Sequence, residues 1–305
     1  MKPASPTGTA DVPVGRHRSV STHDYVALTK PRLNLLVVAT SAAGYYLGAT
    51  EAVRAVPMTL TVVGTALVAS GAAVLNQVYE RDTDRLMART RQRPLPDGRV
   101  ATRDAQIFGL LLSFGGLALL MLSSNLTAML LALATLVVYV IIYTPMKRYS
   151  SLSTLVGAIP GALPPLIGWA ASHGALSIGG WTLFGIVFLW QIPHFMAIAW
   201  LYRDDYRSAG FPMLPTIETD GRRTGQQALL YALALVPMSL LPAYIGISGW
   251  LYFWASLVLS FGLAALAARF ALTRSTGAAR SLFFGSITYL PLLWVAMIVD
   301  HVGGR

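Results

Sequence analysis

The chain has 305 residues, of which 55% are hydrophobic and 12% are charged, and its net charge is +10. Charged residues make up about a quarter of an ordinary soluble protein, so this composition excludes a protein surrounded by water on all sides. The absence of cysteine excludes disulfides, thiolate metal sites and cysteine nucleophiles. Because the basic residues lie between apolar segments, we expect no nucleic-acid partner.

The N-terminal segment, residues 1–28, is predicted to be a disordered cytosolic tail. It is polar, rich in Pro, Gly, Ser and Thr, and lacks the continuous apolar stretch that a secretory signal peptide needs. The remainder, residues 29–305, is predicted to form one intramembrane domain.

Nine apolar segments are long enough to cross a bilayer, which takes about 20 residues of helix. The fold class predicted is therefore all-α, a polytopic membrane protein. The predicted spans are 33–50, 56–79, 105–123, 126–145, 153–172, 178–202, 226–246, 248–268 and 281–300. Of the 23 Lys and Arg residues, 21 fall in alternate connections or the N-terminal tail, on one side of the membrane. The positive-inside rule makes this side cytoplasmic, with the N-terminus in the cytoplasm and the C-terminus outside.

Three polar residues lie one turn apart at the cytoplasmic end of the second predicted span. Asn76, Glu80 and Asp84 follow at intervals of four, so they share one face if the helix continues. Carboxylates this close repel one another and need a cation. The pattern leaves two interpretations open: a loop in which neighbouring arginines neutralise the acids, or a Mg²⁺ site completed by water and substrate phosphates.

A second acidic segment, at the end of the sixth predicted span, favours the metal. Asp204 and Asp205 follow a helix that runs in the same direction as the second one, and the two segments are loosely alike. A repeated four-helix unit followed by a ninth helix would produce this pattern. Two carboxylate clusters edged with arginine suit a Mg²⁺-bound diphosphate, and a cavity between apolar helices suits a long apolar tail. Together they indicate ionisation of a prenyl diphosphate.

His194 lies within the sixth predicted span, next to Pro193 and among apolar residues. It precedes Asp205 by eleven residues, which places it about 16 Å deeper along a continuous helix. An ionisable group inside the membrane is a candidate for function, and an imidazole there can ligate haem iron or transfer protons. The residues alone leave both roles open.

Four segments together resemble the haem O synthase (protohaem IX farnesyltransferase) branch of the UbiA-type intramembrane prenyltransferases. They are TKPRLNLL at 29–36, NQVYERDTDRLMARTRQRPLP at 76–96, YTPMKRYSSLSTLVGAIPGALPPLIGW at 143–169 and WQIPHFMAIAWLYRDDYRSAGFPMLP at 190–215. The resemblance runs from about residue 29 to the end of the ninth span, and the four segments in combination are highly specific.

The resemblance implies nine helices around a central cavity in the inner membrane of a bacterium. It implies transfer of the farnesyl group of farnesyl diphosphate to a vinyl group of haem b, with addition of water, to make haem O for terminal oxidase biogenesis. The implied cofactor is Mg²⁺, with haem b as a substrate. The implied partners are the two substrates, membrane lipid, and a downstream haem-modifying enzyme or oxidase assembly.

The resemblance also implies a set of site residues. Those carried over for catalysis are Asn76, Glu80, Asp84, Arg89 and Arg93; for haem and substrate binding, His194, Arg89, Arg93 and Lys147; and for the metal, Asn76, Glu80, Asp82, Asp84, Asp204 and Asp205. The sequence departs from the wider superfamily at Glu80, where an Asp is usual, and at Ser208, where a further acid is usual. Which carboxylate holds which metal therefore stays open.

Two other functions compete with this one. A prenyltransferase for an aromatic or quinone precursor would use the same diphosphate site, but a small phenolic acceptor needs no iron ligand such as His194. A transporter is suggested by the weak repeat and the intramembrane histidine. Transporters keep their ionisable residues near the membrane midplane, whereas nearly all the acids here lie at one rim.

Overall fold

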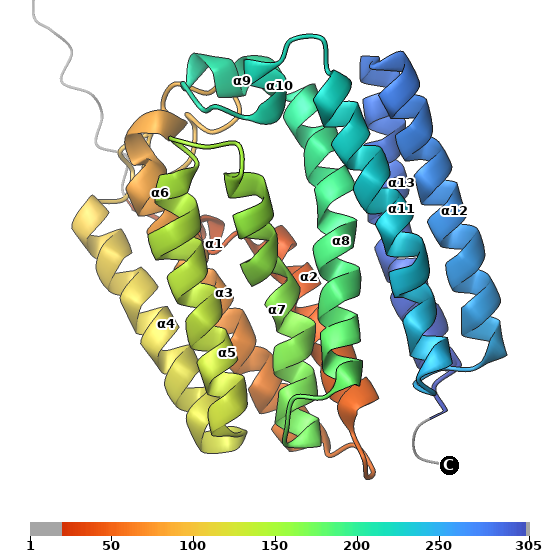
Figure 1. Ribbon diagram of the computed structural model, residues 1–305. Helices are drawn as coiled ribbons and strands as arrows, with labels where there is room; N and C mark the ends of the chain where they lie inside the picture. The colour runs from red at the N-terminus through yellow and green to blue at the C-terminus, as the bar shows by residue number, and fades with distance from the viewer. Residues whose placement is uncertain (1–19, 303–305) are drawn as a thin grey trace, which may run out of the picture.

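The structure is a computed structural model that describes residues 20–302, which form a bundle of long helices with short helices at one end (Figure 1). The all-α prediction is confirmed over these residues. The long helices are α2 Pro31–Gly48, α3 Ala55–Asp84, α4 Thr102–Ser123, α5 Leu126–Val137 continued by η1 Val138–Tyr143 and α6 Thr144–Met146, α7 Ser153–His173, α8 Ile178–Leu201, α11 Arg222–Tyr244, α12 Trp250–Thr273 and α13 Thr276–Val299. The short ones are α1 Thr22–Leu28, α9 Arg203–Ser208 and α10 Leu214–Ile217.

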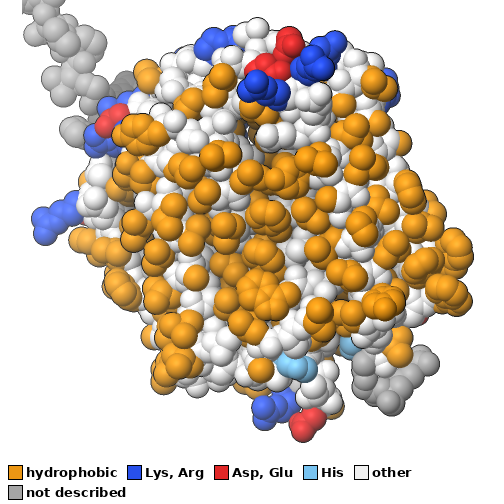
Figure 2. All heavy atoms as spheres, viewed as in Figure 1, with side chains coloured by type: hydrophobic (Ala, Val, Ile, Leu, Met, Phe, Trp, Pro, Cys, Tyr) orange, Lys and Arg blue, Asp and Glu red, His pale blue; other side chains and the backbone are white. Residues whose placement is uncertain are grey.

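Eight helical segments of the described chain are long and apolar enough to cross a membrane. They correspond to the second to ninth predicted spans, and apolar side chains cover the flank of the bundle in a broad belt (Figure 2). The first predicted span is α2, a helix of 18 residues whose Arg32 and Asn34 make its start polar. Eight spans are therefore found, and the count of nine stays a prediction.

The helices that precede the two acidic segments, α3 and α8, end at the same end of the bundle, as predicted (Figure 1). Figure 2 shows basic and acidic side chains gathered there, over α9 and its surroundings. We call this the charged end: it carries α9, α10 and the connection 85–101 between α3 and α4.

Part of the predicted N-terminal tail is helical. Residues 1–19 lie outside the described residues, but α1 forms a helix whose N-cap, Ser21, makes a capping box with Asp24. Leu28 is fully buried, and its carbonyl oxygen accepts a hydrogen bond from Gln77 Nε2 at 2.6 Å. Asp24 also pairs with Arg99 of the 85–101 connection. These contacts dock α1 on α3 and hold the chain just before Lys30.

The fourth predicted span is not a uniform α-helix, because η1 is a π-helix of six residues. The Thr144 hydroxyl donates to the Tyr139 carbonyl, five residues earlier, at 2.7 Å. Such π segments inside helices are frequent at functional sites. Apolar periodicity gave no sign of it, since all six residues are apolar or aromatic.

Helices α2 and α7 pack backbone to backbone through glycine. A Cβ added at Gly44 would lie 2.0 Å from the Pro165 carbonyl oxygen, and one added at Gly168 would lie 2.0 Å from the Ser41 carbonyl oxygen. Small residues allow this close approach between membrane helices. The pair forms one wall of the central cavity described below.

Gly44→Ala is therefore expected to destabilise the protein by about 1–3 kcal/mol, because the backbone of α7 cannot yield. The matched control is Gly262→Ala on α12, where an added Cβ meets nothing within 4 Å. Thermal unfolding in detergent measures both variants. Equal midpoints for the two would contradict the tight α2–α7 contact.

Candidate active site

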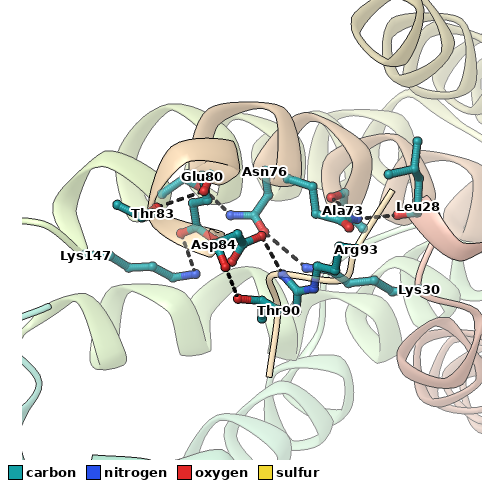
Figure 3. A network of polar contacts seen from close by, with 12 residues as sticks. Leu28, Lys30, Ala73, Asn76, Glu80, Thr83, Asp84, Thr90, Arg93 and Lys147 are labelled. Carbon is teal, nitrogen blue, oxygen red and sulfur yellow. Dashed lines mark hydrogen bonds and ion pairs between the residues drawn. The ribbon is translucent and has the colours of Figure 1, made fainter. Parts of the chain in front are cut away.

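One face of α3 carries polar residues at three successive turns (Figure 3). The exposed fractions of Asn76, Glu80 and Asp84 are 1%, 5% and 1%. The predicted helix thus continues through Asp84, five residues beyond the apolar segment, and brings the three side chains onto one buried face. Burying two carboxylates this close is costly unless cations or hydrogen bonds compensate them.

Three basic residues from three different segments supply that compensation. Lys30 Nζ donates to Asn76 Oδ1 at 3.1 Å. Lys147 Nζ lies 2.9 Å from Glu80 Oε1, and Arg93 Nη1 lies 2.8 Å from Asp84 Oδ2. We call these six side chains the polar network. It joins α3 to the start of α2, to the 85–101 connection and to the end of α6.

Asn76 has a fixed orientation within the polar network. Its Nδ2 donates to Thr144 Oγ1 at 3.1 Å, and Thr144 is fully buried. Since Oδ1 accepts from Lys30, both ends of the amide are engaged, and the side chain is held in one orientation (Figure 3).

Lys30 is a site residue that the sequence did not single out. It stands in the left-handed region, at φ 51°, which is strained for a residue with a side chain. Burial, with repulsion from Arg93 and Lys147, lowers the pKa of Lys30 to about 7. For Lys147, burial also opposes the charge, but Tyr143 and Glu80 outweigh it and raise its pKa above the ordinary value. Pro31, the first residue of α2, was the one local signal that a helix starts at this lysine.

An apolar cavity of about 290 Å³ lies between the helices directly below the polar network. Along α3 it is lined by small residues on the face that ends in Asn76: Thr65, Val68, Ala69, Ala72 and Ala73. Lys30 belongs both to the lining and to the polar network. Tyr139 and Tyr143 of the π-helix also line the cavity, and Lys147 Nζ lies 4.5 Å from the centre of the Tyr143 ring.

The donor set on α3 fits a hard divalent cation. Glu80 Oε1 is enclosed and accepts no hydrogen bond, although it faces the Lys147 ammonium. Within residues 20–302 no group of three or more acidic or histidine side chains is close enough to hold a metal alone. Mg²⁺ suits such a site, because it takes one or two carboxylates and completes its shell with water and phosphate oxygens.

The second acidic segment lies next to the first through the 85–101 connection. Ser208 Oγ lies 3.3 Å from the Leu86 carbonyl oxygen, and the Arg89 guanidinium lies 5.0 Å from the centre of the Tyr202 ring. Asp204 is 76% exposed and pairs with Arg207 at 2.8 Å. Among the described residues, no hydrogen bond or ion pair joins Asp204 or Asp205 to the polar network.

Asp82 lies apart from the buried face of α3. Its side chain is 68% exposed and pairs with Arg81 at 3.0 Å and with Arg85 at 3.7 Å. The structure therefore brings together Asn76, Glu80, Asp84, Arg93 and Lys147 of the predicted residues. Asp82, Asp204, Asp205 and Arg89 lie around them.

His194 lines the cavity from α8. Its Nδ1 lies 2.8 Å from Ser286 Oγ of α13, and its ring stacks against Trp190 and Phe283 with centroid distances of 5.1 and 5.2 Å. The imidazole is thus held by two helices, and it faces the same cavity that opens below the polar network.

Comparisons of sequence and of fold agree with each other. The family model described as UbiA prenyltransferase family matches residues 37–288. The protoheme IX farnesyltransferase of Solibacter usitatus (strain Ellin6076) is 44% identical over 289 residues, covering 92% of this chain and 99% of that protein.

Two solved structures share the fold. A digeranylgeranylglyceryl phosphate synthase matches with a TM-score of 0.78 at 18% identity, covering 91% of this chain and 97% of that one. A UbiA homolog from Archaeoglobus fulgidus, bound to GPP and Mg²⁺, matches with a TM-score of 0.63 at 17% identity, covering 90% of this chain and 99% of that one.

Proposed function

The chain belongs to the UbiA prenyltransferase family, and on that premise we propose that it transfers the farnesyl group of farnesyl diphosphate to a vinyl group of haem b. Addition of water completes the product, haem O. The name of the 44% identical relative, protoheme IX farnesyltransferase, supports this choice of substrates.

The observation that carries the proposal is that one face of α3 is first apolar and then polar along the helix. Small residues from Thr65 to Ala73 line an apolar cavity, and the next turns present Asn76, Glu80 and Asp84 with their cations. A substrate with an apolar tail and an anionic head matches this arrangement, with the tail in the cavity and the head at the polar network. Farnesyl diphosphate would lie along α3 with its diphosphate at the charged end.

The polar network contains acidic groups that suit a metal cation and basic groups that suit the diphosphate anion. Asn76, Glu80 and Asp84 are proposed to hold Mg²⁺, which when bound neutralises the charge of the leaving diphosphate. Lys30, Lys147, Arg89 and Arg93 are proposed to bind diphosphate oxygens. Asp204 and Asp205, on the adjacent α9, are proposed to reach a second ion from the other side of the diphosphate. Asp82 pairs with arginines on the exposed side of α3, away from Glu80 and Asp84, and is not given a place in this metal site.

The reaction follows from this placement. The farnesyl carbon–oxygen bond breaks, and its electrons leave with the diphosphate, whose charge Lys30, Lys147 and Arg93 stabilise. The terminal carbon of the haem vinyl group forms the new carbon–carbon bond, which leaves a cation on the carbon next to the porphyrin. Water adds there and loses a proton, so haem b, farnesyl diphosphate and water give haem O and diphosphate. The apolar lining, with Tyr139 and Tyr143, keeps water from the allylic cation before the carbon–carbon bond forms.

The direction in which the bundle crosses the membrane is part of the proposal. The positive-inside rule puts the charged end, and hence the diphosphate site, on the cytoplasmic side of a bacterial inner membrane. The N-terminus would then be cytoplasmic and the C-terminus outside. Haem O would leave the site for a downstream haem-modifying enzyme or oxidase assembly.

Mass analysis of the porphyrin tests the proposal directly. The purified protein is incubated with haem b, farnesyl diphosphate and Mg²⁺, and we expect a product heavier by a farnesyl group plus water. Omitting Mg²⁺ should abolish it. Modification of a benzoate or quinone acceptor, with haem b unchanged, would overturn the choice of haem.

Lys30→Met is expected to weaken binding of farnesyl diphosphate by about 10- to 100-fold, because a buried charge-assisted hydrogen bond contributes about 1.5–3 kcal/mol. Titration calorimetry measures the affinity. The control is Arg54→Met at the other end of α3, where the side chain is exposed. An unchanged affinity in Lys30→Met would remove this lysine from the diphosphate site.

A further inference from the structure

The edge of the His194 ring that meets α13 is held by one serine. His194 Nδ1 lies 2.8 Å from Ser286 Oγ, and Ser286 is fully buried. The Ser286 carbonyl oxygen accepts a hydrogen bond from Trp190 Nε1 at 2.8 Å, and Trp190 stacks on the imidazole. Two atoms of the same residue thus hold the histidine, one directly and one through its stacking partner.

The direction of the serine hydrogen bond determines which ring nitrogen carries the proton. Ser286 Oγ has one hydrogen, which it donates to the Phe283 carbonyl oxygen at 2.7 Å. Towards His194 the hydroxyl therefore acts as an acceptor. A neutral imidazole that donates from Nδ1 has its lone pair on Nε2.

The other edge of the ring faces the cavity. His194, Trp190 and Gln191 line the cavity, whereas Ser286 and Phe283 do not. Within residues 20–302, His194 Nε2 makes no hydrogen bond, and it is not among the enclosed polar atoms that lack a partner. Stacking on Trp190 and Phe283 fixes the ring plane, so the free lone pair has one direction.

We infer that Ser286 is a positioning residue that holds His194 as its Nδ1–H tautomer and presents the Nε2 lone pair to the acceptor substrate in the cavity. The inference rests on the proposed function for the identity of that substrate, the iron porphyrin. A histidine that binds a metal through one ring nitrogen is usually oriented by a hydrogen bond that the other ring nitrogen donates. Here Ser286 Oγ accepts that hydrogen bond. Either role open to His194, ligation of iron or acceptance of a proton from the adding water, needs the same lone pair.

The first test measures which ring nitrogen of His194 carries the proton, with no substrate present. The ring nitrogens of ¹⁵N-histidine-labelled protein are observed by NMR at a pH where the imidazole is neutral, and His194→Gln assigns the signals. We expect a protonated Nδ1 and an unprotonated Nε2 in the unsubstituted chain. In Ser286→Ala we expect a mixture of tautomers, because Nδ1 has lost its acceptor, while the Trp190 bond to the backbone stays. A protonated Nε2 in the unsubstituted chain, or identical spectra for the two proteins, would overturn the inference.

The second test reads the consequence for haem. Ser286→Ala is expected to weaken haem binding by about 10- to 100-fold, the usual cost of losing a partner that orients a metal ligand, and to change the haem absorption spectrum. Ser286→Thr keeps a hydroxyl that bonds the preceding turn of the helix and should restore both. The matched control is Ser256→Ala on α12, since Ser256 is equally buried and donates to Phe253 O at 2.9 Å but does not contact His194. An equal loss in Ser256→Ala, or no rescue by threonine, would assign Ser286 a purely structural role.

The two tests separate this inference from the proposed function. If the tautomer responds to Ser286→Ala but haem b is never farnesylated, the positioning role stands and the substrate is wrong. If haem O forms while Nε2 carries the proton, the proposed function stands and the positioning role falls.

Discussion

Asp84→Asn is expected to lower the rate of farnesyl transfer by about 100- to 1000-fold, the range found when one group that stabilises transition-state charge is removed. Asp84 is 1% exposed, and its Oδ2 lies 2.8 Å from Arg93 Nη1. The asparagine has nearly the same shape but no charge, so it weakens the proposed Mg²⁺ site and leaves the Arg93 guanidinium without a negative charge beside it. Turnover at saturating farnesyl diphosphate and haem b measures the loss.

Asp82→Asn is the matched control, because it removes a carboxylate two residues away on the exposed side of the same helix. The Asp82 pairs with Arg81 and Arg85 are exposed, and such pairs contribute about 0–1 kcal/mol. Turnover should therefore stay within about fivefold of the unsubstituted chain. Raising Mg²⁺ should recover part of the activity of Asp84→Asn, while a denatured variant would not respond. Equal losses in the two variants would show that the buried face of α3 has no special part in the reaction.

The buried face of α3 could be predicted from the sequence because its cause is local. Asn76, Glu80 and Asp84 recur every fourth residue, and helical geometry alone puts them on one side. The positions of the arginines along the sequence likewise predicted that the charged residues gather at one end of the bundle. Helix ends were less accurate: the second predicted span stops at 79, whereas α3 continues to Asp84 as a helix held by ion pairs.

What could not be predicted depends on contacts between segments far apart in the chain. Lys30 reaches Asn76 across 46 residues, and Ser286 reaches His194 across 92. From the sequence, a serine inside an apolar helix is interpreted as a small packing residue, and nothing in the neighbouring sequence distinguishes Ser286 from Ser256. The π-helix needs the bond between Thr144 and the Tyr139 carbonyl, which the apolar pattern does not encode.

A second large effect on substrate binding is expected when the cavity is filled. The part of the cavity next to the polar network is lined by alanine. Ala72 lies four residues before Asn76, which is about 6 Å along α3, and it is 3% exposed. A phenylalanine there would fill the cavity just below the polar network. Ala72→Phe should therefore exclude most of a farnesyl tail while leaving room for a five-carbon dimethylallyl group.

The size of the effect follows from the apolar surface that the tail can no longer bury. Each buried CH₂ contributes about 0.8 kcal/mol, so displacing only four carbons costs about 3 kcal/mol, more than a 100-fold loss of affinity for farnesyl diphosphate. Affinity for dimethylallyl diphosphate should change little, since its diphosphate still meets Lys30, Lys147 and Arg93. Ala265→Phe, on the exposed face of α12, is the control for added bulk and should bind both diphosphates normally. If Ala72→Phe bound farnesyl diphosphate as tightly as the unsubstituted chain, the tail would have to lie outside this cavity, and the order of surfaces along α3 would no longer support the proposed substrate.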